Sequence, residues 1–226
     1  MLPSCTLAHR PMPTRLFLPR LYVILDATLL TVSAIECAQE LAGAGVRLMQ
    51  YRHKHAPAGE MLNVSKELAS TLQPQGITLI VNDRPDVAAM AHASGVHVGQ
   101  DDLGVEATRS LVGEKIVGIS THNLGQFEKA IESSADYIAV GPIFATSSKE
   151  NPDPVVGTEL IRRVRSLTDK PIVAIGGIKL ENAAEVVAAG ADSVAVISDI
   201  LRAPDRRQRA KQYLDLLGEA QQGASA

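Results

Sequence analysis

The stretch PIVAIGGIKLENAAEVVAAGADSVAVIS, residues 171–198, contains two short apolar runs separated by a segment with helical spacing. Each run is rich in Val and Ile, which is typical of a strand buried on both faces of a parallel sheet. The segment between them, residues 180–188, predicts a helix. The stretch therefore predicts a strand–helix–strand unit, the connection that joins parallel strands.

The same pattern recurs on either side of this stretch. The predicted strands are LYVILD (21–26), RLMQYR (47–52), TLIVND (78–83), GVHVGQ (95–100), KIVGIS (115–120), DYIAVG (136–141), PIVAIG (171–176) and SVAVIS (193–198). The predicted helices cover 32–42, 59–72, 85–93, 105–111, 124–133, 157–166, 180–188 and 203–217. Because such crossovers are right-handed, eight of them can close into a barrel.

We therefore predict the α/β class, as a single-domain, parallel, eight-stranded (β/α)8 TIM barrel. The alternative, an open doubly wound sheet, normally carries a glycine fingerprint after its first strand, and LYVILDATLL lacks one. We expect a flexible N-terminal arm over residues 1–18, or an upstream start, because Met12 could also initiate. The barrel is then expected over 19–220 and a C-terminal tail over 221–226.

Composition excludes several classes of function. The formal net charge is −3 with no long run of one sign, which disfavours nucleic acid and anionic membranes as partners. No apolar stretch reaches the ~18 residues of a membrane span, and the first residues lack a secretory signal's apolar core. Cys5 and Cys37 do not have metal-ligand spacing, so we expect two reduced thiols in a cytoplasmic protein.

The predicted strands end on polar residues or glycine. These closing residues are Asp26, Arg52, Asp83, Gln100, Ser120, Gly141, Gly176 and Ser198. A barrel of this type carries its site at the C-terminal ends of its strands, so these positions are candidates for the site. The alternative is that strand ends are polar only because they are exposed to solvent, which accounts for one or two of these residues.

The second predicted strand ends in MQYRHKH, residues 49–55. Side chains alternate along a strand, so Gln50, Arg52 and Lys54 share one face, while Met49 and Tyr51 face the helices. If Gln50 faces the barrel interior, two cations and an amide converge there. An Arg fork beside a Lys suits a phosphate or diphosphate. A solvated basic turn is the alternative.

Acidic residues follow the next two predicted strands, in VNDR (81–84) and GQDD (99–102). Asn82, Asp83, Asp101 and Asp102 are therefore expected at neighbouring strand ends. Mg²⁺ takes one or two carboxylates together with phosphate oxygens and water, so this group predicts a magnesium site beside a diphosphate. Helix capping by Asp83 and Asp102 is an alternative that does not exclude metal binding, and it is open whether Asp101 shares the metal.

A second anion site is predicted on the other side of the barrel. The long loop GPIFATSSKENPDPVVG (141–157) carries Thr146, Ser148 and Lys149, and long loops in compact domains are usually functional or disordered. GGI (176–178) and Ile197-Ser198 follow the seventh and eighth strands, where this fold usually binds phosphate through backbone N–H groups.

Together these motifs resemble the thiamine phosphate synthase family from about Leu21 onward. The matching residues are Gln50-x-Arg52-x-Lys54, Asn82-Asp83, GVHVGQDD (95–102), GIS ending at Ser120, GPIF-x-T-x-S-K (141–149), GGI (176–178) and Ile197-Ser198. The chain departs from the family pattern at His53, Ala145 and Ser148, none of which removes an essential group. The resemblance implies a transferase of thiamine biosynthesis that couples 4-amino-2-methyl-5-(diphosphomethyl)pyrimidine with thiazole ethyl phosphate, or its carboxylated form. The products are thiamine phosphate and pyrophosphate, and the implied mechanism is a dissociative, Mg²⁺-assisted loss of diphosphate.

The resemblance also implies roles for residues. The pyrimidine diphosphate would be held by Gln50, Arg52, Lys54, Asn82, Ser120 and Lys149, and the catalytic residues would be Arg52, Lys54, Ser120 and Lys149. The metal ligands would be Asp83 and Asp102. The thiazole phosphate would be held by Thr146, Ser148, Gly177, Ile197 and Ser198. The expected partners are these two phosphorylated small molecules, with no nucleic acid and no membrane, and assembly into a homo-oligomer is open.

The sequence leaves four alternatives to be weighed. A thiazole tautomerase-like paralogue on the same barrel would not need the full diphosphate and Mg²⁺ set. A sugar-phosphate isomerase or epimerase would need an acid/base pair instead. A phosphate sensor without catalysis would have no use for the metal cluster. A zinc site at His53-x-His55 would lack a third ligand at any recognised spacing.

Overall fold

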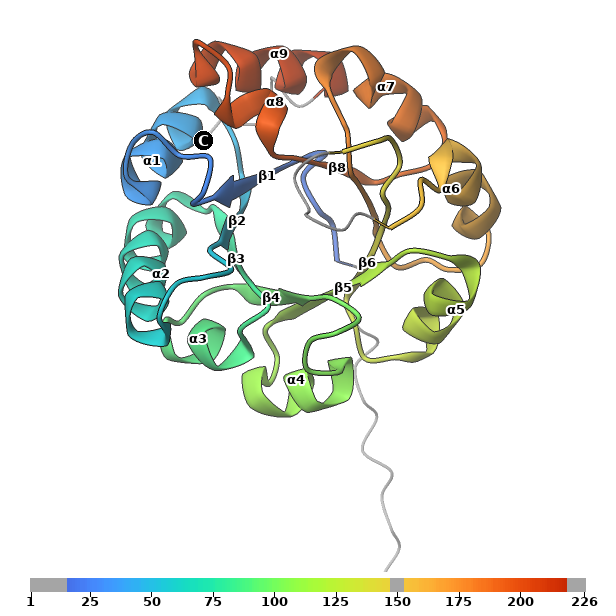
Figure 1. Ribbon diagram of the computed structural model, residues 1–226, viewed down its shortest axis with the longest axis horizontal. Helices are drawn as coiled ribbons and strands as arrows, with labels where there is room; N and C mark the ends of the chain where they lie inside the picture. Colours follow the sequence, from blue (N-terminus) through green and yellow to red (C-terminus); the bar gives the residue numbers. More distant parts are fainter. Residues whose placement is uncertain (1–15, 147–152, 219–226) are drawn as a thin grey trace, which may run out of the picture.

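The computed structural model describes residues 16–146 and 153–218 as one ring of strands inside a ring of helices (Figure 1). Within these residues the strands form a closed parallel barrel in chain order, which confirms the predicted (β/α)8 topology and excludes the open sheet. Its strands are β1 (Leu21–Asp26), β2 (Leu48–Arg52), β3 (Thr78–Asn82), β4 (Gly95–Val98), β5 (Ile116–Thr121), β6 (Tyr137–Val140), β7 (Ile172–Ile175) and β8 (Ser193–Val196). Each agrees with its predicted range to within two residues.

The helices cover the outside of the barrel. They are α1 (Ala34–Ala44), α2 (Ala58–Leu72), α3 (Pro85–Met90), α4 (Val105–Val112), α5 (Leu124–Glu132), α6 (Gly157–Arg165), α7 (Leu180–Ala188), α8 (Ser198–Leu201) and α9 (Arg206–Leu217), with a 3₁₀ turn, η1 (Gln73–Gln75). Sequence analysis missed α8 because a four-residue helix is too short to show a 3.6-residue period. Side chains cap the starts of α1, α5 and α9, as where Asn123 accepts a hydrogen bond from the backbone N–H of Gln126.

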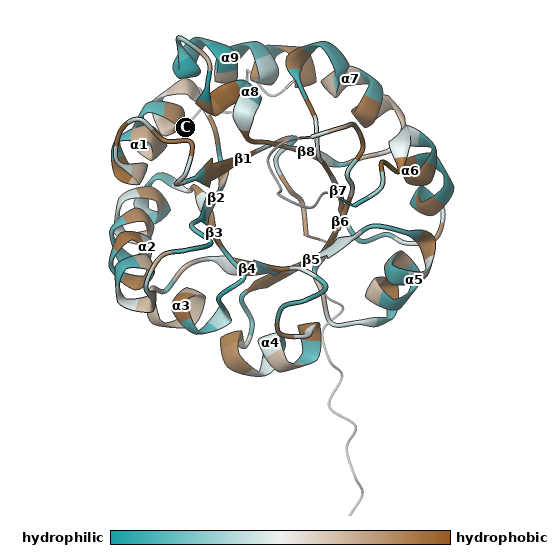
Figure 2. Cartoon of the chain, in the orientation of Figure 1, coloured by the Kyte–Doolittle hydropathy of each residue, from teal (hydrophilic) through white to brown (hydrophobic). Residues whose placement is uncertain are grey.

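Two apolar layers hold the fold together. The larger lies between barrel and helices and includes Met49 and Tyr51 from β2. The smaller fills the barrel interior and includes Tyr22, Ile80 and Tyr137. Most helices in Figure 2 carry both brown and teal stretches, as expected when only one face of a helix packs inward. Gln50 and Arg52 alternate with Met49 and Tyr51 along β2, so they face the interior, as predicted.

The end of the barrel where the strands begin, called the floor here, is held by two similar ion pairs. Arg109 of α4 donates to Asp136 at 2.6 Å, and Arg165 of α6 donates to Asp192 at 2.5 Å. Each Asp precedes a strand and also accepts a backbone N–H from an adjoining strand, from Val117 at 2.7 Å and Ile172 at 2.8 Å. The pairs thus tie a helix and two strands together at equivalent places.

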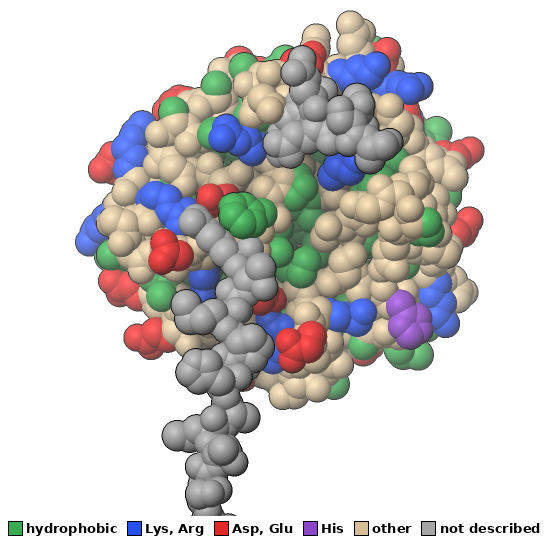
Figure 3. Space-filling view, turned by 180° about the vertical axis from the view of Figure 1, so that it is seen from behind, with side chains coloured by type: hydrophobic (Ala, Val, Ile, Leu, Met, Phe, Trp, Pro, Cys, Tyr) green, Lys and Arg blue, Asp and Glu red, His purple; other side chains and the backbone are tan. Residues whose placement is uncertain are grey.

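Seen from behind, hydrophobic side chains lie near the middle of the visible face, with charged side chains around them (Figure 3). Leu16 and Leu18 pack against the interior cluster. Residues 1–15, which make up most of the expected arm, and the expected tail lie outside the described residues. Among the described residues, no helix combines the length and the apolar character needed to cross a membrane.

Candidate active site

The C-terminal ends of the strands form the opposite end of the barrel, called the mouth here. Parallel pairing in register brings Asp26 at the end of β1 beside Arg52 at the end of β2. Asn82 at the end of β3 lies beside His97 of β4, and Ser120 of β5 lies beside Ala139 of β6. The barrel therefore gathers at one end polar residues that are far apart in the sequence.

Arg52 is held by Asp26, a residue that sequence analysis named only as a strand end. Asp26 is 2% exposed, and its carboxylate forms an ion pair with the Arg52 guanidinium. The other Asp26 oxygen accepts hydrogen bonds from the backbone N–H and the hydroxyl of Thr28, at 3.0 and 2.6 Å. Asp26 is thus fixed on both sides, and it limits the orientations open to Arg52. The strand register could have revealed this partner, because it pairs the two positions directly.

Lys54, Asp83 and Asp102 lie together at the mouth. The Lys54 ammonium is 3.3 Å from a carboxylate oxygen of Asp83. Asp102 accepts the backbone N–H of Gly99 at 2.7 Å, and its carboxyl interacts directly with that of Asp83. Burial, and then the neighbouring Asp83 carboxyl, raise the pKa of Asp102, while the Gly99 N–H opposes the shift.

Neither carboxylate caps a helix, which was the alternative interpretation. The residue before α3 is Arg84 and the residue before α4 is Gly104, and neither helix has a side-chain cap. Asp83 adopts a positive φ of 60°, an uncommon conformation for a residue other than glycine. The two carboxylates are thus brought face to face by the loops that follow β3 and β4.

This pair fits a divalent cation that arrives with a phosphate. Two carboxylates that repel each other are stabilised when a cation binds to both, and oxygen ligands suit Mg²⁺. No cluster of three metal-type side chains occurs within residues 16–146 and 153–218. Mg²⁺ commonly takes only one or two carboxylates and fills its other positions with water and phosphate oxygens. Asp101, the adjacent acid, is exposed.

Gln50, Asn82 and Ser120 add uncharged polar groups to the mouth. Gln50 is 2% exposed and its amide nitrogen donates to the Tyr22 hydroxyl at 2.8 Å. Ser120 Oγ is 2.8 Å from His97 Nε2. Asn82 at the end of β3 is also buried. These uncharged polar groups can hydrogen-bond a ligand that enters the mouth.

His97 of β4 has no role in the sequence-based prediction, and the structure gives it a defined position. Its ring lies in the barrel interior, between the Ser120 hydroxyl and the Tyr137 hydroxyl, and burial lowers the pKa of His97 to about 4. It is therefore neutral at physiological pH. No sequence motif marked His97 and Tyr137 as partners, because they come from β4 and β6.

The predicted monophosphate half lies at the ends of β7 and β8. Gly177 has a φ of 64°, and a Cβ there would lie 2.5 Å from the Ala145 carbonyl oxygen, so only glycine allows this approach. Ile197 directly follows β8 and Ser198 begins α8. Thr146 lies in the loop after β6. Two predicted members of the site, Ser148 and Lys149, lie outside the described residues.

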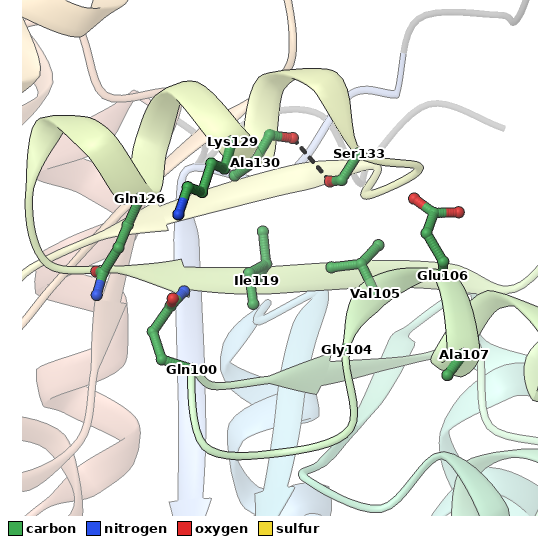
Figure 4. Close-up of a pocket in the computed structure, with 10 residues that line it drawn as sticks. All are labelled: Gln100, Gly104, Val105, Glu106, Ala107, Ile119, Gln126, Lys129, Ala130 and Ser133. Carbon is green, nitrogen blue, oxygen red and sulfur yellow. Dashed lines mark hydrogen bonds between the residues drawn. The ribbon is translucent and has the colours of Figure 1, made fainter.

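A cavity of ≈ 320 Å³ occurs elsewhere, on the outer side of β5 between α4 and α5 (Figure 4). Its lining includes Val105, Ile119 and Ala130, together with the polar Gln126 and Lys129. Ile119 alternates with Ser120 along β5, so this cavity and the barrel interior lie on opposite faces of the strand. It contains none of the mouth carboxylates, and we do not assign the site to it.

Comparisons with known proteins point to one family. A family model described as thiamine monophosphate synthase matches residues 21–200. Thiamine-phosphate synthase of Koribacter versatilis is 52% identical over 91% of this chain and 99% of its own length. The Chloroflexus aurantiacus enzyme of the same name is 43% identical over 91% of this chain and 95% of its own. The solved thiamine phosphate pyrophosphorylase of Pyrococcus furiosus superposes with a TM-score of 0.81 at 32% identity, covering 88% of this chain and 96% of that one.

Proposed function

The chain belongs to the thiamine monophosphate synthase family, and on this premise we propose that it couples 4-amino-2-methyl-5-(diphosphomethyl)pyrimidine with thiazole ethyl phosphate, or its carboxylated form. The enzyme is a transferase that forms a C–N bond and releases pyrophosphate, with thiamine phosphate as the product. The observation that carries the choice of substrates is the set of charges at the mouth, where Arg52 and Lys54 lie beside paired carboxylates.

Arg52 and Lys54 would bind the diphosphate. As the bond between the methylene carbon and the diphosphate oxygen breaks, its electron pair leaves with the diphosphate, and negative charge grows there. Cations already in position stabilise that charge without reorganising. Asp26 supports this role because it limits the movement of Arg52. Lys149 would join them from the loop after β6, on the strength of the family motif.

Asp83 and Asp102 would hold Mg²⁺. When bound, the ion would neutralise charge on the leaving diphosphate. The chain's own part is to keep both carboxylates at one place, through the Gly99 N–H at Asp102 and the Lys54 ammonium at Asp83. Lys54 would then serve two partners, the carboxylate and the diphosphate.

The electron-rich aminopyrimidine can support a methylene cation, so the thiazole nitrogen can attack without a side-chain nucleophile. Gln50, Asn82 and Ser120 would also hold the pyrimidine diphosphate. The second substrate, the thiazole phosphate, would be bound by Gly177, Thr146, Ser148, Ile197 and Ser198. The barrel would act mainly by holding the two rings in reacting positions and by keeping water from the cation.

The test is a coupled assay on purified protein. With both substrates and Mg²⁺, thiamine phosphate and pyrophosphate should appear in equal amounts, and excess chelator should stop both. A tautomerase-like protein would instead isomerise the thiazole compound when the pyrimidine diphosphate is left out. Isomerisation without coupling would refute the synthase proposal, and so would the absence of any product.

A further inference from the structure

A continuous chain of hydrogen bonds crosses the barrel interior beneath the mouth. Gln50 Nε2 donates to the Tyr22 hydroxyl at 2.8 Å, and that hydroxyl is 3.1 Å from the Tyr137 hydroxyl. The Tyr137 hydroxyl is 2.9 Å from His97 Nδ1, and His97 Nε2 is 2.8 Å from Ser120 Oγ. We call these five residues the relay. Its two ends, Gln50 and Ser120, are both candidate ligands of the pyrimidine diphosphate, whereas Tyr22, Tyr137 and His97 between them are not.

The relay has a defined place in the barrel. Tyr137 stacks on His97 with ring centroids 5.5 Å apart and meets Tyr22 edge-on at 6.3 Å. Gly118 of β5 makes room for Tyr137, because a Cβ at that position would lie 2.1 Å from the phenol ring. Both tyrosines are fully buried. A buried polar chain of this kind costs free energy unless every member is paired, so its geometry is held tightly.

Counting protons shows how the ends depend on each other. His97 sits between uncharged hydroxyls in the interior, where a charged ring would be costly, so it carries one N–H. Each phenol keeps its proton, since burial raises the pKa of Tyr22 and of Tyr137. If Gln50 donates to Tyr22, then Tyr22 donates to Tyr137, Tyr137 donates to His97 Nδ1, and His97 Nε2–H donates to Ser120.

In that arrangement the Gln50 carbonyl, the second Gln50 N–H and the Ser120 O–H group are left for a ligand. The only other arrangement that pairs every member reverses all the bonds, and it leaves the Gln50 NH₂ group and a Ser120 lone pair. Any mixed arrangement leaves a buried donor or acceptor unpaired, which costs about 1–3 kcal/mol. Gln50 and Ser120 therefore change their hydrogen-bonding character together.

We propose that Tyr137 and His97 are positioning residues that couple the hydrogen-bonding state of Gln50 to that of Ser120. This coupling selects a substrate whose ring carries an amino donor and whose anionic group accepts a hydrogen bond from Ser120. The inference rests on the proposed function and deepens it. An amino group needs the Gln50 carbonyl, and an anion needs the Ser120 O–H, so one arrangement satisfies both. An oxo group in place of the amino group would face the Gln50 carbonyl, acceptor against acceptor, unless the amide turns over. Turning the amide over reverses the relay, and Ser120 then loses its hydrogen bond to the anion.

The test compares kcat/KM for the aminopyrimidine diphosphate with kcat/KM for the analogue that has an oxo group in place of the amino group. Tyr137→Phe removes one hydroxyl and keeps the ring beside Gly118, so it breaks the relay with little change in packing. We expect the amino-over-oxo preference to fall about tenfold, because Gln50 can then rotate without affecting Ser120. Tyr51→Phe is the matched control. Its hydroxyl lies outside the barrel, 3.4 Å from His53, and its loss should leave the preference unchanged.

Tyr22→Phe removes the hydroxyl that joins Gln50 to Tyr137, so it also breaks the relay. It serves as the test variant if Tyr137→Phe does not fold. A second measurement is Ser120→Ala, which should lower the preference in the otherwise native chain but not in Tyr137→Phe. A general weakening of folding would change kcat/KM for both compounds alike and would leave their ratio as it was. An unchanged ratio in folded Tyr137→Phe and Tyr22→Phe overturns the relay. Absence of turnover in the native enzyme overturns the proposed function instead.

Discussion

The floor and the mouth of the barrel use charge in different ways. At the floor, Arg165 reaches Asp192 and the Lys170 carbonyl, and Asp192 also accepts the Ile172 N–H. These charges are satisfied within the fold. At the mouth, Asp83 and Asp102 face each other, and the pKa of Asp102 is raised by burial and by its neighbour. The floor therefore contributes to stability, whereas the mouth keeps groups that a ligand must complete, as is general for this fold.

The largest expected effect comes from removing one mouth carboxylate. Asp102→Asn keeps the shape of the side chain but removes one of the two proposed metal ligands. We expect kcat/KM to fall by about 100-fold or more, while the melting temperature is retained or rises because the repulsion between carboxyls is relieved. Steady-state kinetics and thermal unfolding measure the two effects.

Asp101→Asn is the matched control for this change. It makes the same substitution at the adjacent, exposed position. Activity within about twofold of the native value is expected, in line with the small effects of most surface changes. A large loss in Asp101→Asn, or none in Asp102→Asn, would show that the wrong carboxylate has been assigned.

The second largest effect is expected at the floor, where a substitution should lower stability without changing activity. Arg165→Met keeps much of the side-chain bulk but removes the donors to Asp192 and to the Lys170 carbonyl. We expect the free energy of unfolding to fall by about 2 kcal/mol, with KM and kcat unchanged at temperatures where the variant is folded. Denaturant unfolding gives the first quantity. Arg162→Met is the control, because its ion pair with Glu159 on the same helix is exposed.

Asp26→Asn should separate binding from catalysis within the mouth. The amide removes the charge that holds Arg52, so more positive charge remains to bind the diphosphate but in a less defined position. We expect kcat to fall about tenfold with a smaller change in KM, since the lost interaction matters most in the transition state. Asp86→Asn, which breaks an exposed pair with Arg84, should change neither. A tenfold rise in KM at constant kcat would contradict this role.

The smallest predicted effect concerns the interior between the two ends. His97 has its pKa lowered from 6.5 to about 4 in the fold, so the unfolded chain binds more protons between these values. The free energy of unfolding therefore falls as the pH falls through this window. The free energy of unfolding should therefore fall less between pH 7 and pH 6 in His97→Gln than in the native chain, by about 0.7 kcal/mol. Urea unfolding of both proteins at each pH measures it, and parallel pH profiles would count against a neutral, buried His97.

The barrel could be predicted from the sequence because each strand and helix is signalled locally. The run of valines and isoleucines in 171–176 and 193–198 identifies strands whatever surrounds them. The site could be predicted as far as it follows strand ends, which is why Gln50, Arg52, Asp83 and Asp102 were named. Asp26, Tyr137 and His97 gain their partners only through barrel closure and register, and those contacts leave no local pattern.

The most direct test of this division of roles is one assay on three proteins: the native chain, Asp102→Asn and Arg165→Met. Each is given both substrates and Mg²⁺ at a temperature where all three are folded, and thiamine phosphate and pyrophosphate are followed together. We predict that the native chain and Arg165→Met form both products in equal amounts at the same rate, while Asp102→Asn forms almost none. Equal rates in all three proteins, or a loss confined to Arg165→Met, would contradict the account.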